Sequence, residues 1–267
     1  MNIFSLKGKT AIVTGATGLL GQEHCKALSE AGANVIIADL NLDACKKLSS
    51  EISSDSLPIE LDVTSKDSII SALNIGIAKY GKIDILVNNA AINDMFESPK
   101  AALENSKLEN YPLELWQKSI DVNLTGVFLC SQIIGSQMAK SGGGVIINIA
   151  STYGITAPDQ SLYVDENGKQ LFFKPPAYSV TKAAVIALTK YIASYWGKQN
   201  VRCVCLSPGG VYNNQNETFV KKYSAKTMLG RMANKEDYKS ALIFLASDGA
   251  SYMTGANLII DGGFTAW

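Results

Sequence analysis

The sequence has few of the residues on which hydrolytic and metal-dependent sites are usually built. Its 267 residues include one histidine, His24, which lies in a predicted helix without a partner in the pattern. Neither a Ser-His-Asp triad nor a histidine-based zinc site is therefore expected. Five cysteines are scattered with no Cys-x-x-Cys pair, and Cys203 and Cys205 suit packing on one face of a strand. The lack of a disulfide framework predicts a reducing, cytoplasmic location.

Charge of one sign and long apolar runs are also lacking. The 24 basic residues balance the 24 acidic ones, with no long run of either, so neither nucleic acid nor an anionic membrane is an expected partner. Residues 1–10 carry lysines and no apolar core, so no signal peptide is expected. Polar residues such as Asn123 and Gln132 interrupt the charge-free stretch 122–139, which predicts a buried helix rather than a membrane span.

Short apolar segments alternate with segments of helical periodicity along the whole chain. Strands are predicted at residues 9–14, 34–38, 57–61, 83–87, 145–149, 201–206 and 257–260. Helices are predicted to end near residue 31 and to cover 42–53, 67–80, 112–140, 177–196 and 235–247, with an irregular stretch at 95–109. This alternation predicts one α/β domain, 1–267, with a doubly wound, mostly parallel seven-stranded sheet and helices on both faces.

A glycine-rich turn follows the first predicted strand. Gly15, Gly18 and Gly21 occur in the run Gly-Ala-Thr-Gly-Leu-Leu-Gly, directly before a helix. Free N–H groups at a helix start bind phosphate, and glycines let the backbone approach it closely. The turn therefore predicts a site for a dinucleotide pyrophosphate.

The second predicted strand leads into Asp39, 18 residues beyond Gly21. A carboxylate near this position typically binds a ribose 2′-hydroxyl, although Asp39 could also cap the next helix. It would repel a 2′-phosphate, and no lysine or arginine stands at positions 16, 17, 40 or 41. The sequence therefore predicts NAD rather than NADP.

Polar residues also follow the other predicted strands. Asp62 could meet an adenine or cap a helix, while Asn88-Asn89 could line a ribose groove or stabilise a loop. Ser151 directly follows the fifth strand, at the sheet edge where open α/β folds bind ligands. Asn123 interrupts an apolar helix, where a buried amide needs a partner or a water.

Tyr178 and Lys182 are four residues apart in a predicted helix and share one of its faces. An ammonium beside a phenol favours the phenolate and lowers its pKa, which allows proton exchange nearer neutrality. The spacing alone is no commoner than chance predicts, so its weight comes from its place among the strand ends described above.

Residues 152–176 interrupt the regular alternation before this helix. Residues 162–173 predict a β-hairpin turning at Asn167-Gly168. The insertion could be a lid or specificity wall, or instead an oligomer contact or a surface decoration. Its polar residues suit a hydroxyl-rich substrate; they are Tyr163, Asp165, Glu166, Lys169 and Gln170. A later segment, 212–228, is expected to be a mobile substrate loop.

Taken together, these residues resemble the short-chain dehydrogenase/reductase family, in its compact single-domain, Rossmann-type branch. The match runs from about residue 7 to residue 263. The residues that carry it are Thr14-Gly15, Gly18, Gly21, Asp39, Asp62-Val63, Asn88-Asn89-Ala90, Asn123, Asn148-Ile149-Ala150-Ser151, Tyr178-x-x-x-Lys182, Pro208-Gly209 and Asp261-Gly262-Gly263.

The resemblance implies a role for each of four residues. Tyr178 would be the general acid/base, and Ser151 would hydrogen-bond the reacting oxygen. Lys182 would lower the pKa of Tyr178 and bind the nicotinamide ribose, while Asn123 would hold a water linking Lys182 to solvent. Cofactor contacts are expected at Gly15, Thr17, Gly18, Leu20, Gly21, Asp39, Leu40, Asp62, Val63, Asn89, Ala90, Tyr178, Lys182, Pro208, Gly209 and Val211. The family also implies a homodimer or homotetramer built through residues 112–140 and 177–196.

Four features depart from the family pattern. The glycine spacing is closer to the branch that modifies sugar nucleotides, since the compact branch has glycine at position 19. Ala91 replaces a glycine, and Asn213 stands where a threonine is usual. About twice the usual number of residues separates Ser151 from Tyr178, so the insertion must loop out for both to reach one substrate atom.

The leading hypothesis is an NAD-dependent oxidoreductase that interconverts a secondary alcohol and a ketone on a polar small molecule, with a sugar or sugar derivative expected. A sugar-nucleotide epimerase or dehydratase that retains NAD is an alternative, favoured by the glycine spacing. Too little chain follows Asp261 for that branch's substrate domain. A non-catalytic NAD-binding protein is the other alternative, against which the complete set of Asn123, Ser151, Tyr178 and Lys182 argues.

Overall fold

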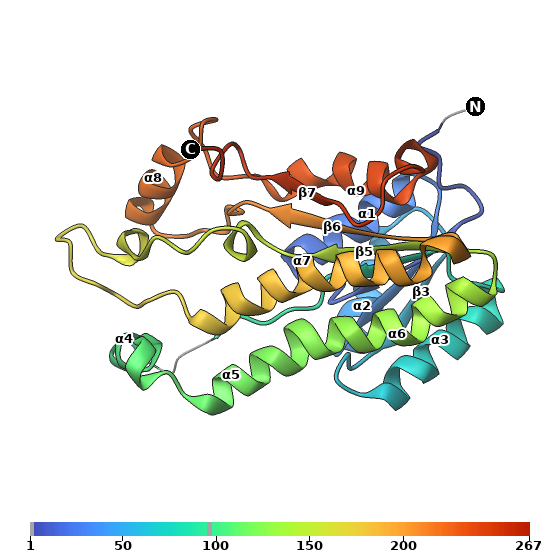
Figure 1. Cartoon of the computed structure of the whole chain (residues 1–267), viewed down its shortest axis with the longest axis horizontal. Helices are drawn as coiled ribbons and strands as arrows, with labels where there is room; N and C mark the ends of the chain where they lie inside the picture. Colours follow the sequence, from blue (N-terminus) through green and yellow to red (C-terminus); the bar gives the residue numbers. More distant parts are fainter. Residues whose placement is uncertain (1–2, 95–97) are drawn as a thin grey trace.

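A parallel sheet of seven strands runs through the computed structural model, which describes residues 3–94 and 98–267 (Figure 1). The strand order is β3-β2-β1-β4-β5-β6-β7, and every neighbouring pair is parallel. The strands are β1 (Thr10–Thr14), β2 (Asn34–Asp39), β3 (Ser56–Glu60), β4 (Ile85–Asn88), β5 (Gly144–Ile149), β6 (Val201–Pro208) and β7 (Asn257–Ile260). The predicted doubly wound sheet is confirmed, and it is parallel throughout. The chain order reverses between β1 and β4, where such sheets bind ligands.

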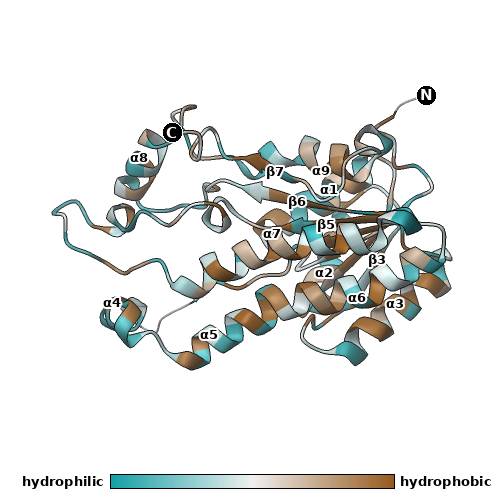
Figure 2. Cartoon of the chain, in the orientation of Figure 1, coloured by the Kyte–Doolittle hydropathy of each residue, from teal (hydrophilic) through white to brown (hydrophobic). Residues whose placement is uncertain are grey.

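Helices cover both faces of the sheet because its strands are apolar on both sides. Ala11 and Val13 pack in one core with α1, α2 and α9, while Ile12 between them packs in a second core with α3, α6 and α7. Figure 2 shows the apolar strands between these layers. The helices are α1 (Leu19–Glu30), α2 (Leu42–Glu51), α3 (Lys66–Tyr80), α4 (Pro99–Ser106), α5 (Leu113–Ile120), α6 (Gly126–Lys140), α7 (Pro176–Trp196), α8 (Glu217–Ala225) and α9 (Lys239–Ala246). No helix in the described ranges is long and apolar enough to cross a bilayer.

Two short helices lie where the sequence predicted none. The stretch predicted to be irregular contains α4, which Ser98 caps by accepting a hydrogen bond from the backbone N–H of Ala101. Residues 95–97 of the predicted irregular stretch lie outside the described residues, as do residues 1–2. The segment predicted to be mobile contains α8, which Asn216 caps by accepting from the N–H of Phe219. Side-chain caps satisfy N–H groups that would otherwise lack partners, and so stabilise such short helices.

The predicted β-hairpin at 162–173 was wrong in its strands, although a turn does form at its tip. Gln160–Tyr163 is a 3-10 turn, and one antiparallel bridge joins Val164 to Gln170. The Gln170 amide donates to three backbone carbonyls of the insertion, those of Gln160, Tyr163 and Phe172. This side chain thus supplies hydrogen bonds that a strand ladder would have made.

The predicted helix 112–140 forms with one irregularity. A π-helical turn, Asp121–Thr125, separates α5 from α6 and contains Asn123. Such turns inside α-helices occur frequently at functional sites.

A chain of buried amides joins β4, β5 and α7. The Asn88 amide donates to Asn148 Oδ1 at 2.8 Å, and the Asn148 amide donates to Thr189 Oγ1 at 2.9 Å. Buried polar groups that satisfy one another fix the elements that carry them. This chain therefore fixes α7, which carries Tyr178, against the end of β5, which Ser151 follows.

Burial of His24 is expected to make the stability of the folded protein depend on pH. The His24 side chain in α1 is fully buried, and neither ring nitrogen has a hydrogen-bond partner among the described residues. Burial lowers the pKa of His24 from 6.5 to about 4, so the folded protein holds the neutral ring. The contribution of the neutral His24 ring to the unfolding free energy is fully present above pH 6.5 and is lost as the pH falls towards 4. The loss at pH 5 is about 2 kcal/mol.

We expect His24→Leu to raise stability at pH 7 and to remove this part of the acid sensitivity, because an apolar side chain leaves no buried nitrogen without a partner. Urea unfolding at pH 7 and pH 5 measures both effects. The difference in unfolding free energy between the two pH values should be smaller in the variant. The same difference in both proteins would contradict the assignment.

Candidate active site

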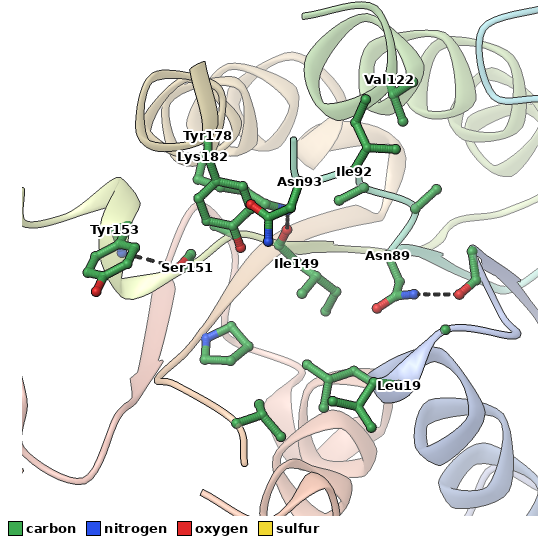
Figure 3. A pocket seen from close by; sticks show the side chains of 18 of the residues that line it. Leu19, Asn89, Ile92, Asn93, Val122, Ile149, Ser151, Tyr153, Tyr178 and Lys182 are labelled. Atoms are coloured by element: carbon green, nitrogen blue, oxygen red, sulfur yellow. Dashed lines mark hydrogen bonds between the residues drawn. The ribbon is translucent and has the colours of Figure 1, made fainter. Parts of the chain in front are cut away.

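A cleft of about 880 Å³ opens at the carboxyl ends of the strands. It is lined by most of the residues that the sequence predicted for a cofactor and reaction site: Gly15, Thr17, Gly18, Leu20, Asp39, Leu40, Asp62, Val63, Asn89, Ala90, Ser151, Tyr178, Lys182, Pro208, Gly209 and Val211. Gly21 and Asn123 lie outside the lining. Figure 3 shows this cleft with side chains from both halves of the sheet.

The glycine turn leaves room for a phosphate beside the start of α1. Gly15 has φ +59°, and a Cβ there would lie 2.6 Å from Ala90 Cα, so only glycine fits. Gly18 precedes α1 and provides no side-chain cap, and no acidic residue lies in the first turn. The first N–H groups of this helix are therefore available to an anion at the cleft. These features fit the pyrophosphate of a dinucleotide.

Gly21 serves packing instead of lining the cleft. A Cβ at this position would lie 2.2 Å from the Gly15 carbonyl oxygen. Any side chain here would therefore push α1 away from the turn. Gly21 is needed for the close approach of helix and strand, and it does not line the cleft where a cofactor contact was predicted.

Asp39 faces the glycine turn from the end of β2. Its Oδ2 accepts hydrogen bonds from the backbone N–H of Thr17 at 2.9 Å and from Thr17 Oγ1 at 2.8 Å. The alternative of a helix cap was wrong, because Asn41 caps α2 by accepting from the N–H of Ala44. Thr17 therefore holds the carboxylate of Asp39 at the cleft.

The other two strand ends have mixed roles. Asp62 Oδ1 accepts from both the N–H and the hydroxyl of Thr64, while Ser65 caps α3, so the capping alternative was wrong for Asp62 as well. Asn89 lines the cleft and also donates to the backbone carbonyls of Thr14 and Gly15. It therefore both stabilises the glycine turn and lines the groove.

Ser151 and Tyr178 meet in the cleft despite the 26 residues between them. Figure 3 shows both side chains in the same part of the site, Ser151 after β5 and Tyr178 on α7. Ser151 Oγ accepts from the backbone N–H of Tyr153 at 3.1 Å, which orients the hydroxyl. Burial raises the pKa of Tyr178, and hydrogen bonding to Ser151 opposes this rise. The insertion loops out, as the sequence required.

Lys182 lies behind Tyr178, but its effect on the phenol differs from the prediction. Its Nζ donates to the Ile149 carbonyl at 2.7 Å and lies 5.8 Å from the centroid of the Tyr178 ring. Burial lowers the pKa of Lys182 to about 8. The net shift of the Tyr178 pKa is upward because the phenol is enclosed by protein and the ammonium is directed at a carbonyl. The predicted lowering was therefore wrong for the protein alone.

Asn123 is fully buried, and its side-chain amide forms two hydrogen bonds with the backbone of Ile92. Its Oδ1 accepts from the N–H of Ile92 at 2.8 Å, and its Nδ2 donates to the Ile92 carbonyl at 3.0 Å. It therefore fastens the segment after β4 to the π-helical turn. Its predicted role in holding a water beside Lys182 stays a prediction.

The insertion contributes a wall of the cleft. Tyr153 and Tyr163 line it, and their hydroxyls are 3.0 Å apart. Tyr163 packs in one apolar cluster with other side chains of the insertion, with side chains of α8, and with side chains that follow α8 in the sequence. This cluster is here called the aromatic wall. Its members are Leu162, Tyr163, Phe172, Phe219, Val220, Tyr223, Met232 and Phe264.

Most of the polar residues expected to face the substrate do not line the cleft. Asp165, Glu166, Lys169 and Gln170 lie outside it. Asp165 accepts from the backbone N–H groups of Asn167 and Lys169 and so closes the turn. The interpretation of these side chains as substrate contacts was wrong, because Asp165 and Gln170 bond to the insertion backbone and Glu166 and Lys169 are exposed outside the cleft.

Several polar residues of the cleft were missed from the sequence, namely Asn93, Lys118, Thr152, Lys174 and Gln215. Gln215 lines it, whereas the exposed Asn213 does not. Lys174 also lines it, four residues before Tyr178. The signal for Lys174 was available as the spacing Lys-x-x-x-Tyr-x-x-x-Lys, but Pro175 and Pro176 start the helix and so leave Lys174 outside its periodicity.

Comparison with known proteins gives consistent results over nearly the whole chain. Residues 15–265 match the family described as enoyl-(acyl carrier protein) reductase. The chain is 34% identical over 268 residues to the NAD-dependent glycerol dehydrogenase of Listeria innocua serovar 6a, with 98% of this chain and 96% of that protein covered. It is 32% identical over 273 residues to a 7alpha-hydroxysteroid dehydrogenase of Bacteroides fragilis, covering 99% and 96%.

A solved structure is similar in fold over the full length. The gluconate 5-dehydrogenase of Burkholderia cenocepacia, determined in complex with NADP and tartrate, superimposes with a TM-score of 0.85 at 28% sequence identity. The superposition covers 100% of this chain and 98% of that chain.

Proposed function

Because this chain belongs to the short-chain dehydrogenase/reductase family, we propose that it is an NAD-dependent oxidoreductase that interconverts a secondary alcohol and a ketone. The proposed substrate is a polar small molecule, in the class of sugars and sugar derivatives. The observation that carries the proposal is the convergence of Ser151 and Tyr178 in the cleft that also contains the glycine turn. A glycerol dehydrogenase among the relatives supports a polyol-like substrate.

In this proposal Tyr178 moves the proton and Ser151 steadies the oxygen. During ketone reduction the phenol donates its proton to the carbonyl oxygen, and during alcohol oxidation the phenolate accepts the hydroxyl proton. The Ser151 hydroxyl donates to the same oxygen as its charge develops. A bound nicotinamide supplies or accepts the hydride. Lys182 adds a positive charge behind the ring, where Ile149 holds it in place.

The preference for NAD rests on the surroundings of Asp39. Its carboxylate lies in the cleft, is held by Thr17, and is followed by the exposed, uncharged Leu40. A 2′-phosphate would bring two negative charges together there, whereas a 2′-hydroxyl can donate to the carboxylate. The relatives' own cofactors differ, with NAD named for the glycerol dehydrogenase and NADP bound to the gluconate 5-dehydrogenase. The argument therefore depends on Asp39 itself.

A cofactor titration and a substrate screen test the proposal together. We expect NAD to bind at least tenfold more tightly than NADP, a difference of about 1.4 kcal/mol, and Asp39→Asn to narrow the gap by removing the charge. Polyols, sugars and their derivatives are then screened for NADH formation. Tighter binding of NADP would refute the cofactor assignment, and no reduction of either cofactor by any alcohol would refute the reaction.

We also propose that the protein is a homodimer or homotetramer that works in the cytoplasm. Large side chains are exposed along α6 and α7, with Phe128 at 43%, Tyr191 at 66% and Tyr195 at 64%, which supports association through these helices. The five cysteines are free, which suits a reducing compartment. Light scattering of the purified protein measures the first point, and a monomer at micromolar concentration would contradict it.

A further inference from the structure

Lys174 lies at the end of the insertion, beside the reacting phenol. Its Nζ is 4.4 Å from the centroid of the Tyr178 ring, and the residue lines the cleft. Ligands that touch the Tyr178 hydroxyl are therefore within reach of this ammonium. A single small molecule can contact both.

The ammonium of Lys174 keeps hydrogen-bonding capacity for a ligand. It donates to Asn93 Oδ1 at 2.9 Å, which uses one of its three donors. Asn93 lies next to Tyr178 in Figure 3. Within residues 3–94 and 98–267, no carboxylate lies within 4.0 Å of the Lys174 ammonium. Asp94 acts on it at longer range, and hydrogen bonds from Tyr111 and Ser119 occupy the oxygens of Asp94.

The position of Lys174 is fixed by its backbone. Its N–H donates to Gln160 Oε1 at 2.8 Å, and its carbonyl accepts from Gln160 Nε2 at 3.3 Å. The preceding N–H, that of Phe173, donates to the buried Ser106 hydroxyl at 2.8 Å. Pro175 and Pro176 then start α7. Because the backbone is fixed before and after Lys174, its side chain extends from a fixed position beside the cleft.

Among the described residues, no acidic side chain lines the part of the cleft next to Lys174. The acidic lining residues, Asp39 and Asp62, lie at the ends of β2 and β3, away from the aromatic wall and β5. The aromatic wall consists of uncharged side chains only, five of them aromatic and three aliphatic. Burial lowers the pKa of Lys174 to about 8, which reflects the cost of holding a cation there. An anion placed against it would offset that cost.

We propose that Lys174 binds an anionic group of the substrate, a carboxylate or a phosphate ester, while the hydroxyl to be oxidised lies between Ser151 and Tyr178. This inference rests on the proposed function and narrows its substrate to hydroxy acids or phosphorylated alcohols. The substrate's C–H bond breaks with transfer of hydride to the nicotinamide, and the hydroxyl proton goes to Tyr178. The carbon–oxygen double bond forms, and the anion stays unchanged.

Three compounds with the same secondary hydroxyl provide the test: glycerol, glycerate and glycerol 3-phosphate, with glucitol and gluconate as a second pair. We expect kcat/KM to be at least tenfold higher for one class of anion than for its neutral counterpart. Lys174→Met should lower kcat/KM for the anionic compounds by about 10- to 100-fold, the usual range for a charged hydrogen bond. Values for the neutral compounds should change by no more than about twofold. Whether glycerate or glycerol 3-phosphate responds identifies the anion.

Two further variants separate binding from structure. Lys174→Arg keeps the charge and should retain most of the preference, whereas loss through a distorted insertion would affect the neutral compounds too. Lys169→Met changes an exposed lysine at the tip of the same insertion and should behave as the parent protein. Equal effects of Lys174→Met on neutral and anionic compounds, or no preference in the parent protein, would overturn the inference and leave the proposed reaction intact.

A binding measurement covers the case in which no compound is oxidised. Malonate and inorganic phosphate are titrated calorimetrically into the protein with and without NADH. At least one anion should bind about tenfold more weakly to Lys174→Met than to the parent protein. Identical binding in both proteins would overturn the role of Lys174, whatever the outcome of the activity screen.

Discussion

Tyr178→Phe is expected to reduce kcat by about 10²- to 10⁴-fold in both directions of the reaction, the usual contribution of a general acid or base. Phenylalanine keeps the ring that Lys174 and Lys182 both approach, so the fold and the cleft should persist. The Kd for NAD should change by no more than about twofold because the glycine turn and Asp39 are untouched. Steady-state kinetics and fluorescence titration of NADH measure the two quantities.

A second tyrosine provides the matched control for this variant. Tyr252 is fully exposed after α9, and Tyr252→Phe removes the same hydroxyl far from the cleft. It should leave kcat unchanged. A Tyr178→Phe protein with the activity of this control would show that another group transfers the proton.

Ser151→Ala is expected to lower kcat by about 10²- to 10³-fold, as removal of one donor to a developing oxyanion usually does. The variant should also shift the pH dependence. Hydrogen bonding to Ser151 lowers the pKa of Tyr178, so its loss raises that pKa further. Alcohol oxidation needs the deprotonated phenol, and its rise with pH should therefore move to higher pH in the variant. Profiles of kcat/KM against pH for both proteins measure this shift.

Ser179, next to Tyr178 in sequence, provides the comparison for Ser151. Its hydroxyl is buried without a hydrogen-bond partner among the described residues, so Ser179→Ala removes a serine hydroxyl without breaking a hydrogen bond. This control should retain kcat and the parent pH profile. If the two alanine variants behaved alike, Ser151 would have no role at the reacting oxygen.

The doubly wound sheet and most of the cleft could be predicted because strand ends carry distinctive residues. Gly15, Asp39, Asn89 and Ser151 each follow an apolar run, and parallel strands bring their carboxyl ends to one edge. Whether a polar residue at a strand end lines the cleft or caps the next helix depended on the residues around it. Asp39 could have been a cap until Asn41 was found to take that place.

The insertion and its partners could not be predicted, for physical reasons. The helix α8 is short, and it is stabilised by packing of Phe219 against Tyr163, which is distant in sequence, with Tyr223 stacked on Phe219. Lys174 precedes two prolines, so helical periodicity gives no indication that it lies over Tyr178. The upward pKa shift of Tyr178 depends on how far protein encloses the phenol, and sequence spacing carries no information on enclosure.

The aromatic wall and the proposed proton-transfer pair belong to different elements of the fold. Ser151 directly follows β5 and Tyr178 lies on α7, and Asn148 and Thr189 join these two elements. The wall consists of side chains from the insertion, α8, the segment after α8 and the segment after β7. Substitutions in the wall can therefore alter which alcohols are accepted while the proton-transfer pair keeps its geometry. Directed evolution towards new substrates should begin with Tyr163, Phe219 and Met232 and leave the sheet as it is.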